Sequence, residues 1–287
     1  MEALKAITEP WLKRLGPTCE AMTPKERLQR RIDDYNADTG TRDQEDGYDC
    51  PVCKNKGFIS AMVEQGPAFY EVFRPCQCDE IRRTRLRLKK AGLLDAVNKL
   101  TFDNYQAIDP WQKRIKETAL RFIQDDAHNF FFIGGQSGAG KTHICTAITA
   151  HYINAGKRAR YMVWFDEATK LKGFVNDPEE YNAIMAELKE TDVLYIDDLF
   201  KPIKGANGQT LPPSYADVRL AMEIINYRYN NPALITIVSG ERILDELLDI
   251  DEALAGRISE LSKEGGYCLN LARDSRRNWR MKGVTTL

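Results

Sequence analysis

The sequence of 287 residues has little net charge, few cysteines and no long apolar run. Its formal net charge is −1, so overall charge does not indicate a nucleic-acid-binding protein, although a charged groove can exist on a neutral chain. No stretch approaches the ~18 apolar residues of a membrane span, and the opening segment MEALKAITEP lacks the apolar centre of a signal peptide. These absences favour a cytoplasmic protein.

Seven cysteines are too few for a disulfide scaffold in a chain of this length, and the sequence contains no internal repeat or low-complexity tract. Hydrophobic residues make up 43% of the chain, which is enough to form a substantial core. The length fits one large domain with a smaller one.

Residue types divide the chain into three parts. Residues 1–79 are polar and cysteine-containing, and they include a predicted helix at 23–38, where Thr23 and Glu26 can form a capping box. Residues 80–99 are predicted to be a basic helix that links two domains. Residues 100–287 are predicted to form an α/β domain.

Short apolar runs with helical segments between them characterise the third part. These runs predict buried strands at 130–135, 159–165, 192–197, 233–239 and 267–271. Strands that alternate with helices indicate a parallel sheet covered by helices on both faces. We therefore expect a parallel five-stranded sheet, preceded by a small helical and cysteine-rich domain.

The motif GQSGAGKT matches the P-loop pattern, and it lies between a predicted strand and a predicted helix. Glycines allow backbone N–H groups to surround a phosphate, and the helix N-terminus adds partial positive charge. The pattern predicts that the lysine contacts the β- and γ-phosphates of ATP and that the threonine hydroxyl binds Mg²⁺. The predicted nucleotide-binding residues are Gly135, Gln136, Ser137, Gly138, Ala139, Gly140, Lys141 and Thr142, with His143 adjoining them.

A P-loop requires a carboxylate for Mg²⁺ at the end of a neighbouring strand. Asp197 meets this requirement, because it follows the apolar run VLYI. Asp198 is predicted to polarise the attacking water, with capping of the next turn as the alternative. Ser239, at the end of a later strand, is a candidate for contacting the γ-phosphate or the water, or is simply a strand-end hydroxyl.

The segments TFDNY, GKTHI, IDDL and VSGERILDELLDIDEALAGRISE together resemble the DnaC-type helicase loaders. These are AAA+ ATPases close to the replication initiators and to the IstB transposition helpers, and the resemblance covers about residues 100–275. It implies an AAA+ ATPase domain at 100–287 without a full helical lid. Many AAA+ proteins have Glu where this chain has Asp198, and the shorter side chain is expected to slow ATP hydrolysis. The resemblance also implies that Arg257 is an arginine finger completing the ATP site of a neighbouring subunit in a ring or spiral oligomer. The alternative for Arg257 is an ordinary surface arginine.

Four cysteines form two pairs, C-x₂-C and C-x-C, at Cys50, Cys53, Cys76 and Cys78. Four thiolates suit tetrahedral Zn²⁺, and a metal supplies folding free energy where the core is small. Free thiols and a redox pair are the alternatives. With no open coordination position, the site is interpreted as structural. A cysteine-rich module before such an ATPase resembles the loaders of Gram-positive bacteria and their phages, and this implies that residues 1–79 contact the partner.

The basic helix at 82–90 and the segment 272–282 can contact the phosphates of single-stranded DNA, or can simply be solvated. The main hypothesis is an ATP-dependent loader that places a replicative DNA helicase on single-stranded DNA when replication begins. The alternatives are an IstB-like transposition helper and an ATP-binding adaptor without motor function.

Overall fold

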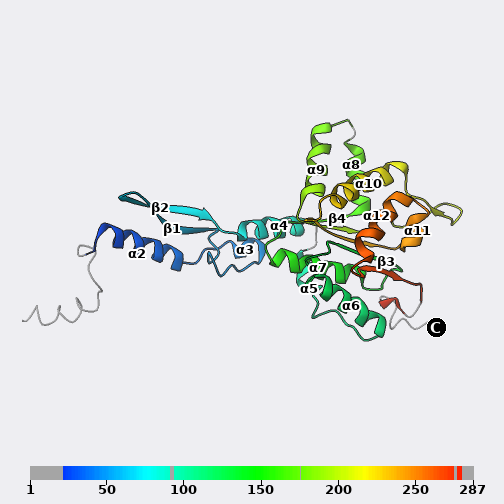
Figure 1. The fold of residues 1–287 in the computed structure, drawn as a ribbon, viewed down its shortest axis with the longest axis horizontal. Helices are drawn as coiled ribbons and strands as arrows, with labels where there is room; N and C mark the ends of the chain where they lie inside the picture. The colour runs from blue at the N-terminus through cyan, green and yellow to red at the C-terminus, as the bar shows by residue number, and fades with distance from the viewer. Residues whose placement is uncertain (1–21, 91–93, 175, 275–276, 280–287) are drawn as a thin grey trace, which may run out of the picture. The chain divides into compact units, whose positions relative to one another are not determined.

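The computed structural model describes residues 22–90, 94–174, 176–274 and 277–279, and the chain divides into two compact units, Met1–Arg82 and Arg83–Leu287 (Figure 1). Parts of the segments considered above lie outside the described residues: 1–21, 91–93, and 275–276 and 280–282 of the segment 272–282. Each unit is described by itself below.

The N-terminal unit is built from a helix packed on a β-hairpin. Helix α2 (Pro24–Ala37) carries the predicted capping box between Thr23 and Glu26. Strands β1 (Phe58–Gln65) and β2 (Ala68–Pro75) pair in antiparallel register, with Gln65 opposite Ala68. The turn between them therefore has two residues, and Gly66 adopts a positive φ of 62° there.

Two side-chain contacts attach α2 to the hairpin. The ring of Tyr35 packs edge-on against Phe73, with 5.0 Å between the ring centroids. The amide of Asn36 bonds to both backbone groups of Ser60, at 2.8 and 3.0 Å. Helix α3 (Asp43–Asp46) precedes the first cysteine pair, and α4 (Cys78–Lys90) begins at the last cysteine. The predicted basic helix at 80–99 overlaps two helices, α4 and α5 (Leu94–Lys99).

The C-terminal unit contains the predicted parallel five-stranded sheet, in the order β4-β5-β8-β3-β9. This confirms the α/β fold expected for an AAA+ domain. All the neighbouring pairs in the sheet are parallel. The strands are β3 (Phe130–Gly135), β4 (Ala159–Val163), β5 (Val193–Asp197), β8 (Ile235–Gly240) and β9 (Cys268–Leu271). A small hairpin, β6 (Ile203–Lys204) with β7 (Thr210–Leu211), follows β5 and was not predicted.

Helices cover both faces of this sheet (Figure 1). One layer contains α5, α6 (Pro110–Phe122) and α7 (Lys141–Asn154). The other contains α8 (Trp164–Gly173), α9 (Pro178–Glu190), α10 (Tyr215–Tyr229), α11 (Leu244–Leu248) and α12 (Glu252–Lys263).

Alternate residues of the central strands face opposite layers. Phe130 and Phe132 of β3 join Leu194 of β5 in one buried cluster with side chains of α8–α12. Phe131 points the other way and contacts Phe122 of α6. The central strands are thus buried on both sides, which explains why their sequences are continuously apolar.

A buried arginine joins the ends of several elements in this unit. Arg228 of α10 is 0% exposed, and its guanidinium donates to the backbone oxygens of Leu188, Lys189, Thr191 and Ile235 and to the hydroxyl of Thr236. Burial lowers the pKa of Arg228 to about 10. The guanidinium satisfies carbonyl groups at the end of α9, which have no partner within the helix.

Candidate nucleotide site and candidate metal centre

The P-loop connects β3 to α7 and depends on three glycines with positive φ: Gly135 at 126°, Gly138 at 77° and Gly140 at 81°. Space is also limited at these positions. A Cβ at Gly135 would lie 2.2 Å from the carbonyl oxygen of Leu271, and one at Gly138 would lie 2.0 Å from Oδ1 of Asn278. Both the backbone conformation and the close neighbours therefore favour glycine.

Lys141 begins α7 and is only 7% exposed. Its ammonium donates hydrogen bonds to the carbonyl oxygens of Gly135 and Gln136, each at 2.8 Å. Burial lowers the pKa of Lys141, while the carboxylates of Glu241, Asp198 and Asp197 oppose that effect. The carbonyl groups of the P-loop thus hold the Lys141 ammonium inside the loop, near these three carboxylates.

Asp197, the last residue of β5, lies beside Thr142. The Thr142 hydroxyl is 3.5 and 3.4 Å from the two carboxylate oxygens of Asp197. Tyr161 donates its hydroxyl proton to Asp197 at 3.2 Å, and Ser239 Oγ also donates to this carboxylate. Hydroxyl and carboxylate oxygens are ligands that Mg²⁺ prefers, so the adjoining pair fits this ion.

Ser239 does not lie where it could contact the γ-phosphate or the attacking water, which was one of the two possibilities considered from the sequence. Its side chain is 0% exposed, lies under Asp197 and is 3.2 Å from the hydroxyl of Tyr195. It does not line the cavity at the P-loop. In this position the hydroxyl orients the Asp197 carboxylate.

A cavity of about 440 Å³ opens at the P-loop. The P-loop contributes residues 137–142 and His143 to its lining, and the ends of β5 and β8 contribute Asp198 and Glu241. Aromatic side chains line it as well: Tyr105, Trp111 and Trp279. Glu241, Lys201 and these aromatic residues were not predicted to belong to this site. Glu241 had one available signal, because it follows a predicted strand in the segment VSGER.

Asp198 and Glu241 share a cation. Lys201 Nζ lies 2.7 Å from Asp198 and 4.0 Å from Glu241, and its pKa is raised first by the hydrogen bond to Asp198. Asp198 has a left-handed backbone, with φ of 56°. Three charged side chains therefore gather beside the P-loop.

His143 lies at the edge of the same cavity. Its Nε2 is 2.9 Å from the carbonyl oxygen of Thr101, and its ring packs edge-on against Tyr105 at 5.1 Å. The segment TFDNY is thereby fastened to the first turn of α7.

The backbone after β9 also contacts the P-loop. The N–H of Trp279 donates to the carbonyl oxygen of Gly138 at 2.9 Å, and the N–H of Asp274 donates to Gln136 Oε1 at 2.5 Å. Part of the predicted DNA-contacting segment at 272–282 thus lies against the nucleotide site.

Arg257 of α12 is not among the residues that line this cavity. Its guanidinium donates to Asn226 Oδ1 at 2.9 Å and to the carbonyl oxygen of Ala253 at 3.0 Å. It also lies 5.8 Å from the ring centre of Tyr229. Arg257 borders a second hollow, lined by residues of α10 that include Tyr215, Arg219 and Asn226.

In the N-terminal unit, the four predicted cysteines come together. All are at most 2% exposed, and their sulfur atoms lie within 4.8 Å of one another. Cys50 Sγ is 3.9 Å from Cys76 Sγ, and Cys53 Sγ is 3.5 Å from Cys78 Sγ. Tetrahedral zinc with Zn–S bonds of about 2.3 Å places sulfur atoms about 3.8 Å apart, so the cluster fits zinc.

The backbone around the cysteines has the conformation of a tight metal-binding turn. Lys54, Asn55 and Gly57 have positive φ values of 47°, 68° and 85°. The N–H of Gly57 donates to Cys53 Sγ at 3.3 Å. Burial raises the pKa of Cys53, but this N–H and the neighbouring thiols lower it to about 7 overall. A lowered thiol pKa favours the thiolate that a metal requires.

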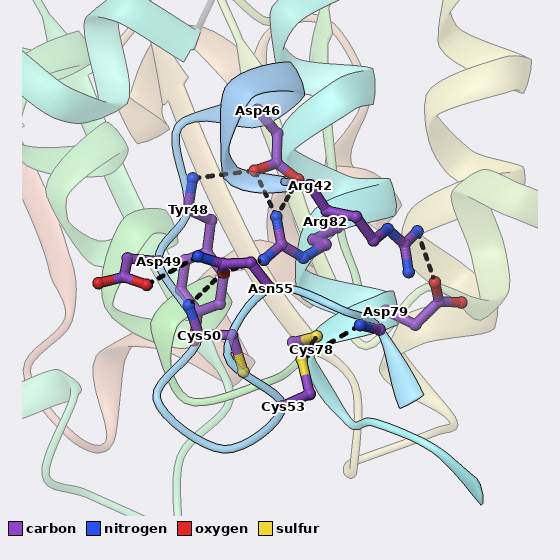
Figure 2. Close-up of polar contacts among 11 residues, drawn as sticks. Arg42, Asp46, Tyr48, Asp49, Cys50, Cys53, Asn55, Cys78, Asp79 and Arg82 are labelled. Atoms are coloured by element: carbon purple, nitrogen blue, oxygen red, sulfur yellow. Dashed lines mark hydrogen bonds and ion pairs between the residues drawn. The ribbon is translucent and has the colours of Figure 1, made fainter. Parts of the chain in front are cut away.

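A polar network surrounds the cysteine cluster (Figure 2). Arg82 is 1% exposed, and its Nη1 lies 2.9 and 3.1 Å from the oxygens of Asp46. Its Nη2 donates to Asn55 Oδ1 at 2.6 Å, and the same oxygen accepts the N–H of Cys50 at 2.8 Å. Burial raises the pKa of Cys78, and the Arg82 guanidinium opposes that rise. The network places one buried cation beside the thiols.

The comparisons with known proteins agree with the geometry of the cavity. Residues 76–248 match the family described as IstB-like ATP binding protein. The chain belongs to this family. It therefore contains an ATP-binding domain of the AAA+ type, as the resemblance to the DnaC-type proteins implied.

The chain is also similar to three curated proteins. The phage-like element PBSX protein XkdC of Bacillus subtilis (strain 168) is 31% identical, over 76% of this chain and 80% of that one. The uncharacterized protein YqaM of the same strain is 28% identical, over 76% and 81%. The replicative helicase loader DnaC of Buchnera aphidicola subsp. Acyrthosiphon pisum (strain APS) is 24% identical, over 39% of this chain and 47% of that one.

Among the residues that the structure describes, no helix is both long enough and apolar enough to span a membrane.

Proposed function

We propose that this protein is an ATP-hydrolysing loader that delivers a replicative DNA helicase to single-stranded DNA. The observation that carries this proposal is the P-loop cavity, where Lys141 and the Thr142–Asp197 pair come together in a chain related to helicase loaders. The relationship to DnaC indicates the class of partner, a replicative helicase. The cavity is the proposed binding site of ATP, whose hydrolysis provides the free energy for loading.

The residues of the P-loop and the side chains around Asp197 have separate roles in this proposal. The backbone N–H groups of the P-loop and the Lys141 ammonium bind the phosphates of ATP. Thr142 and Asp197 hold Mg²⁺, which neutralises phosphate charge when it is bound. Ser239 and Tyr161 keep the Asp197 carboxylate oriented toward this task. Asp198 lies at the cavity as a candidate for orienting water.

Arg257 acts in trans in this proposal. It lies on α12, away from the cavity of its own chain, so its guanidinium is available for the ATP of a neighbouring subunit. An arginine finger of this kind neutralises charge that develops on the γ-phosphate. The functional form is then a ring or spiral oligomer.

The N-terminal unit contacts the helicase in this proposal, and zinc bound by the four cysteines keeps it folded. The metal has no catalytic role, because four protein thiolates complete its tetrahedral coordination. Of the basic helix 82–90, Arg82 and Arg85 are buried, so the exposed Arg83 and Lys89 contribute to DNA binding through phosphate contacts, together with the segment 272–282.

The test is ATP turnover by the purified protein, with and without single-stranded DNA, beside the variants Lys141→Ala and Arg257→Ala. Both variants are expected to lose turnover, and a mixture of the two is expected to recover part of it because sites are shared between subunits. Unchanged turnover in Arg257→Ala would refute the role in trans.

A second measurement addresses the partner. A ring helicase supplied with closed circular single-stranded DNA is expected to unwind an annealed strand faster when this protein and ATP are present. No acceleration by wild type over the helicase alone would contradict the loading function without contradicting ATP binding. Equal acceleration by wild type and by Lys141→Ala would contradict the requirement for ATP.

A further inference from the structure

The two tryptophans of the P-loop cavity come from other elements than its charged residues. Lys141 begins α7, and Asp198 and Glu241 directly follow β5 and β8. Trp111 lies in the first turn of α6, and Trp279 belongs to the segment after β9. Strand β3, which leads into the P-loop, lies between β8 and β9 in the sheet. The carboxylates and the segment of Trp279 therefore reach the P-loop from opposite sides of its strand.

The segment that carries Trp279 is attached directly to the P-loop. The N–H of Trp279 donates to the carbonyl oxygen of Gly138 at 2.9 Å. Asn278 packs so closely on Gly138 that a Cβ there would lie 2.0 Å from the Asn278 Oδ1. Earlier in the segment, the N–H of Asp274 donates to Gln136 Oε1 at 2.5 Å. Trp279 is thus anchored on the loop that is expected to bind phosphates.

Arg277 connects the same segment to the second tryptophan. Its guanidinium lies 5.6 Å from the ring centre of Trp111, a distance at which a cation is attracted to the face of an aromatic ring. The backbone N–H of Arg277 donates to the carbonyl oxygen of Asp274 at 2.9 Å, and its Nη1 donates to that of Ala272 at 3.0 Å. These contacts hold the segment beside the start of α6, so that both tryptophans line one cavity.

The rings of the two tryptophans are accessible, unlike that of the third aromatic residue of the cavity. Trp279 is 43% exposed, and Trp111 is partly exposed. Tyr105 is buried, and its ring packs edge-on against His143. An accessible aromatic ring whose backbone is held in place loses little conformational freedom when a flat ligand stacks on it.

The part of the cavity around Trp111 is uncharged. The lining residues that come from positions 100–112 are Leu100, Asn104, Tyr105, Gln106, Trp111 and Gln112. Such a surface offers aromatic rings and amide groups but no charge to compensate a phosphate. It fits the neutral, aromatic base of a nucleotide, while Lys141 and Thr142 fit the phosphates and their metal ion.

We propose that Trp279, together with Trp111, binds the base of the nucleotide by stacking. The base then contacts a segment that is itself hydrogen-bonded to Gly138, so the base and the phosphates are bound by one connected set of residues. This inference rests on the proposed binding of ATP at the P-loop, and it does not depend on hydrolysis.

The experiment compares the affinity of the full-length protein for two ligands: a non-hydrolysable ATP analogue, and inorganic tripolyphosphate, which lacks the base. Trp279→Ala is expected to weaken binding of the analogue about 5- to 150-fold, the range for losing one stack between a base and an aromatic ring. Its affinity for tripolyphosphate should stay within about threefold of wild type, because the hydrogen bond to Gly138 comes from the backbone.

Two further variants control this comparison. Trp279→Phe keeps an aromatic ring and should recover most of the affinity for the ATP analogue. Phe165→Ala removes an aromatic side chain of α8 that is 58% exposed and does not line the cavity, so it should bind both ligands like wild type.

Tryptophan fluorescence provides a second readout. In Trp111→Phe, the ATP analogue should still change the emission, because Trp279 remains as a reporter at the base. Tripolyphosphate should change the emission much less, and Trp279→Phe should lose most of the response to the analogue.

Different failures have different meanings. Analogue affinity of Trp279→Ala within about threefold of wild type would overturn the contact with the base. Equal weakening of the analogue and of tripolyphosphate would also overturn it, because Trp279 would then act only by shaping the P-loop. A wild-type protein that binds neither ligand would instead overturn the proposed ATP site itself.

Discussion

The two units of this protein differ in what stabilises the fold inside each of them. In the C-terminal unit, large apolar side chains of the central strands and of α8–α12 form a continuous buried cluster. In the described part of the N-terminal unit, the buried hydrophobic residues are Ile32, Ile81 and the four cysteines. A unit with so little apolar core needs another source of stability, and the proposed metal bound by the four thiolates would supply one.

The difference shows that burial has different consequences in the two units. Buried cysteines at 2% exposure or less stabilise a fold mainly through what they bind, whereas buried isoleucines and phenylalanines do so through the water they exclude. The same distinction appears in the buried arginines. Arg82 forms an ion pair with a carboxylate beside the cysteines, while Arg228 donates hydrogen bonds to backbone carbonyl groups between α9 and β8.

The largest effect is expected from removing the metal. Cys53→Ser should abolish stoichiometric zinc and unfold the N-terminal unit, because zinc binding contributes about 10–16 kcal/mol to such small sites. Zinc content and the N-terminal thermal transition would be measured, with the C-terminal transition as the internal reference. The control is Cys268→Ser, since Cys268 belongs to β9. A folded, zinc-free Cys53→Ser unit would show that the core alone is sufficient.

The next effect concerns the ion pair beside the cysteines. Arg82→Met removes the guanidinium that pairs with the buried Asp46 carboxylate, which should cost about 3–5 kcal/mol of stability in the N-terminal unit. Chemical denaturation would measure this loss. The double variant with Asp46→Asn should recover part of it, because it removes the buried negative charge. A double variant no more stable than Arg82→Met would mean that Arg82 acts through the thiols and Asn55 instead.

A comparable loss should follow from a cavity in the apolar core. Ile224 of α10 is 0% exposed, and Ile224→Ala should cost the C-terminal unit about 2–5 kcal/mol. Zinc content should not change. Ile203→Ala, at a residue that is 51% exposed, is the matched control and should stay within about 0.5 kcal/mol of wild type. Loss of zinc from Ile224→Ala would show that the N-terminal unit does not keep its zinc when the C-terminal unit is destabilised.

The smallest effect is expected from a partly buried hydrogen bond in the C-terminal unit. The Tyr267 hydroxyl donates to Asp125 at 2.6 Å, and this bond is the first cause that lowers the pKa of Asp125 from 3.8 to about 2. A lowered carboxyl pKa stabilises the fold above pH 4, and this contribution disappears as the pH falls toward 2. Tyr267→Phe should therefore be less stable at pH 7, with a difference that shrinks in acid. Denaturation at several pH values would check this, and a pH-independent difference would contradict it.

Much of the fold follows from local patterns. The five strands of the parallel sheet were predicted within two residues at each end, because their apolar runs are short and separated by helical segments. The capping box of α2 was also predicted, since it depends on residues three positions apart. The β6–β7 hairpin was missed, because its strands have two residues each.

The candidate sites were partly predictable for the same reason. The P-loop and the cysteine pairs are short motifs, and the spacing of their residues is enough to predict phosphate binding and metal binding. The charged partners in the cavity were harder to find. Glu241 and Lys201 lie 40 residues apart in sequence, and their proximity depends on how β5 and β8 pair. Ser239 was identified as a candidate, but its burial beneath Asp197 depends on the face of β8 on which it lies.

The sequence by itself therefore determined the phosphate-binding loop, the identity of the four thiols and the α/β class, because each depends on residues close together in the chain. Only the tertiary structure decided that Glu241 lies between Asp197 and the P-loop, that Arg82 is buried against Asp46, and that the backbone of Trp279 contacts Gly138. The physical reason is that strand order and helix packing bring distant segments together. These contacts depend on the burial of the whole core, which no short segment encodes.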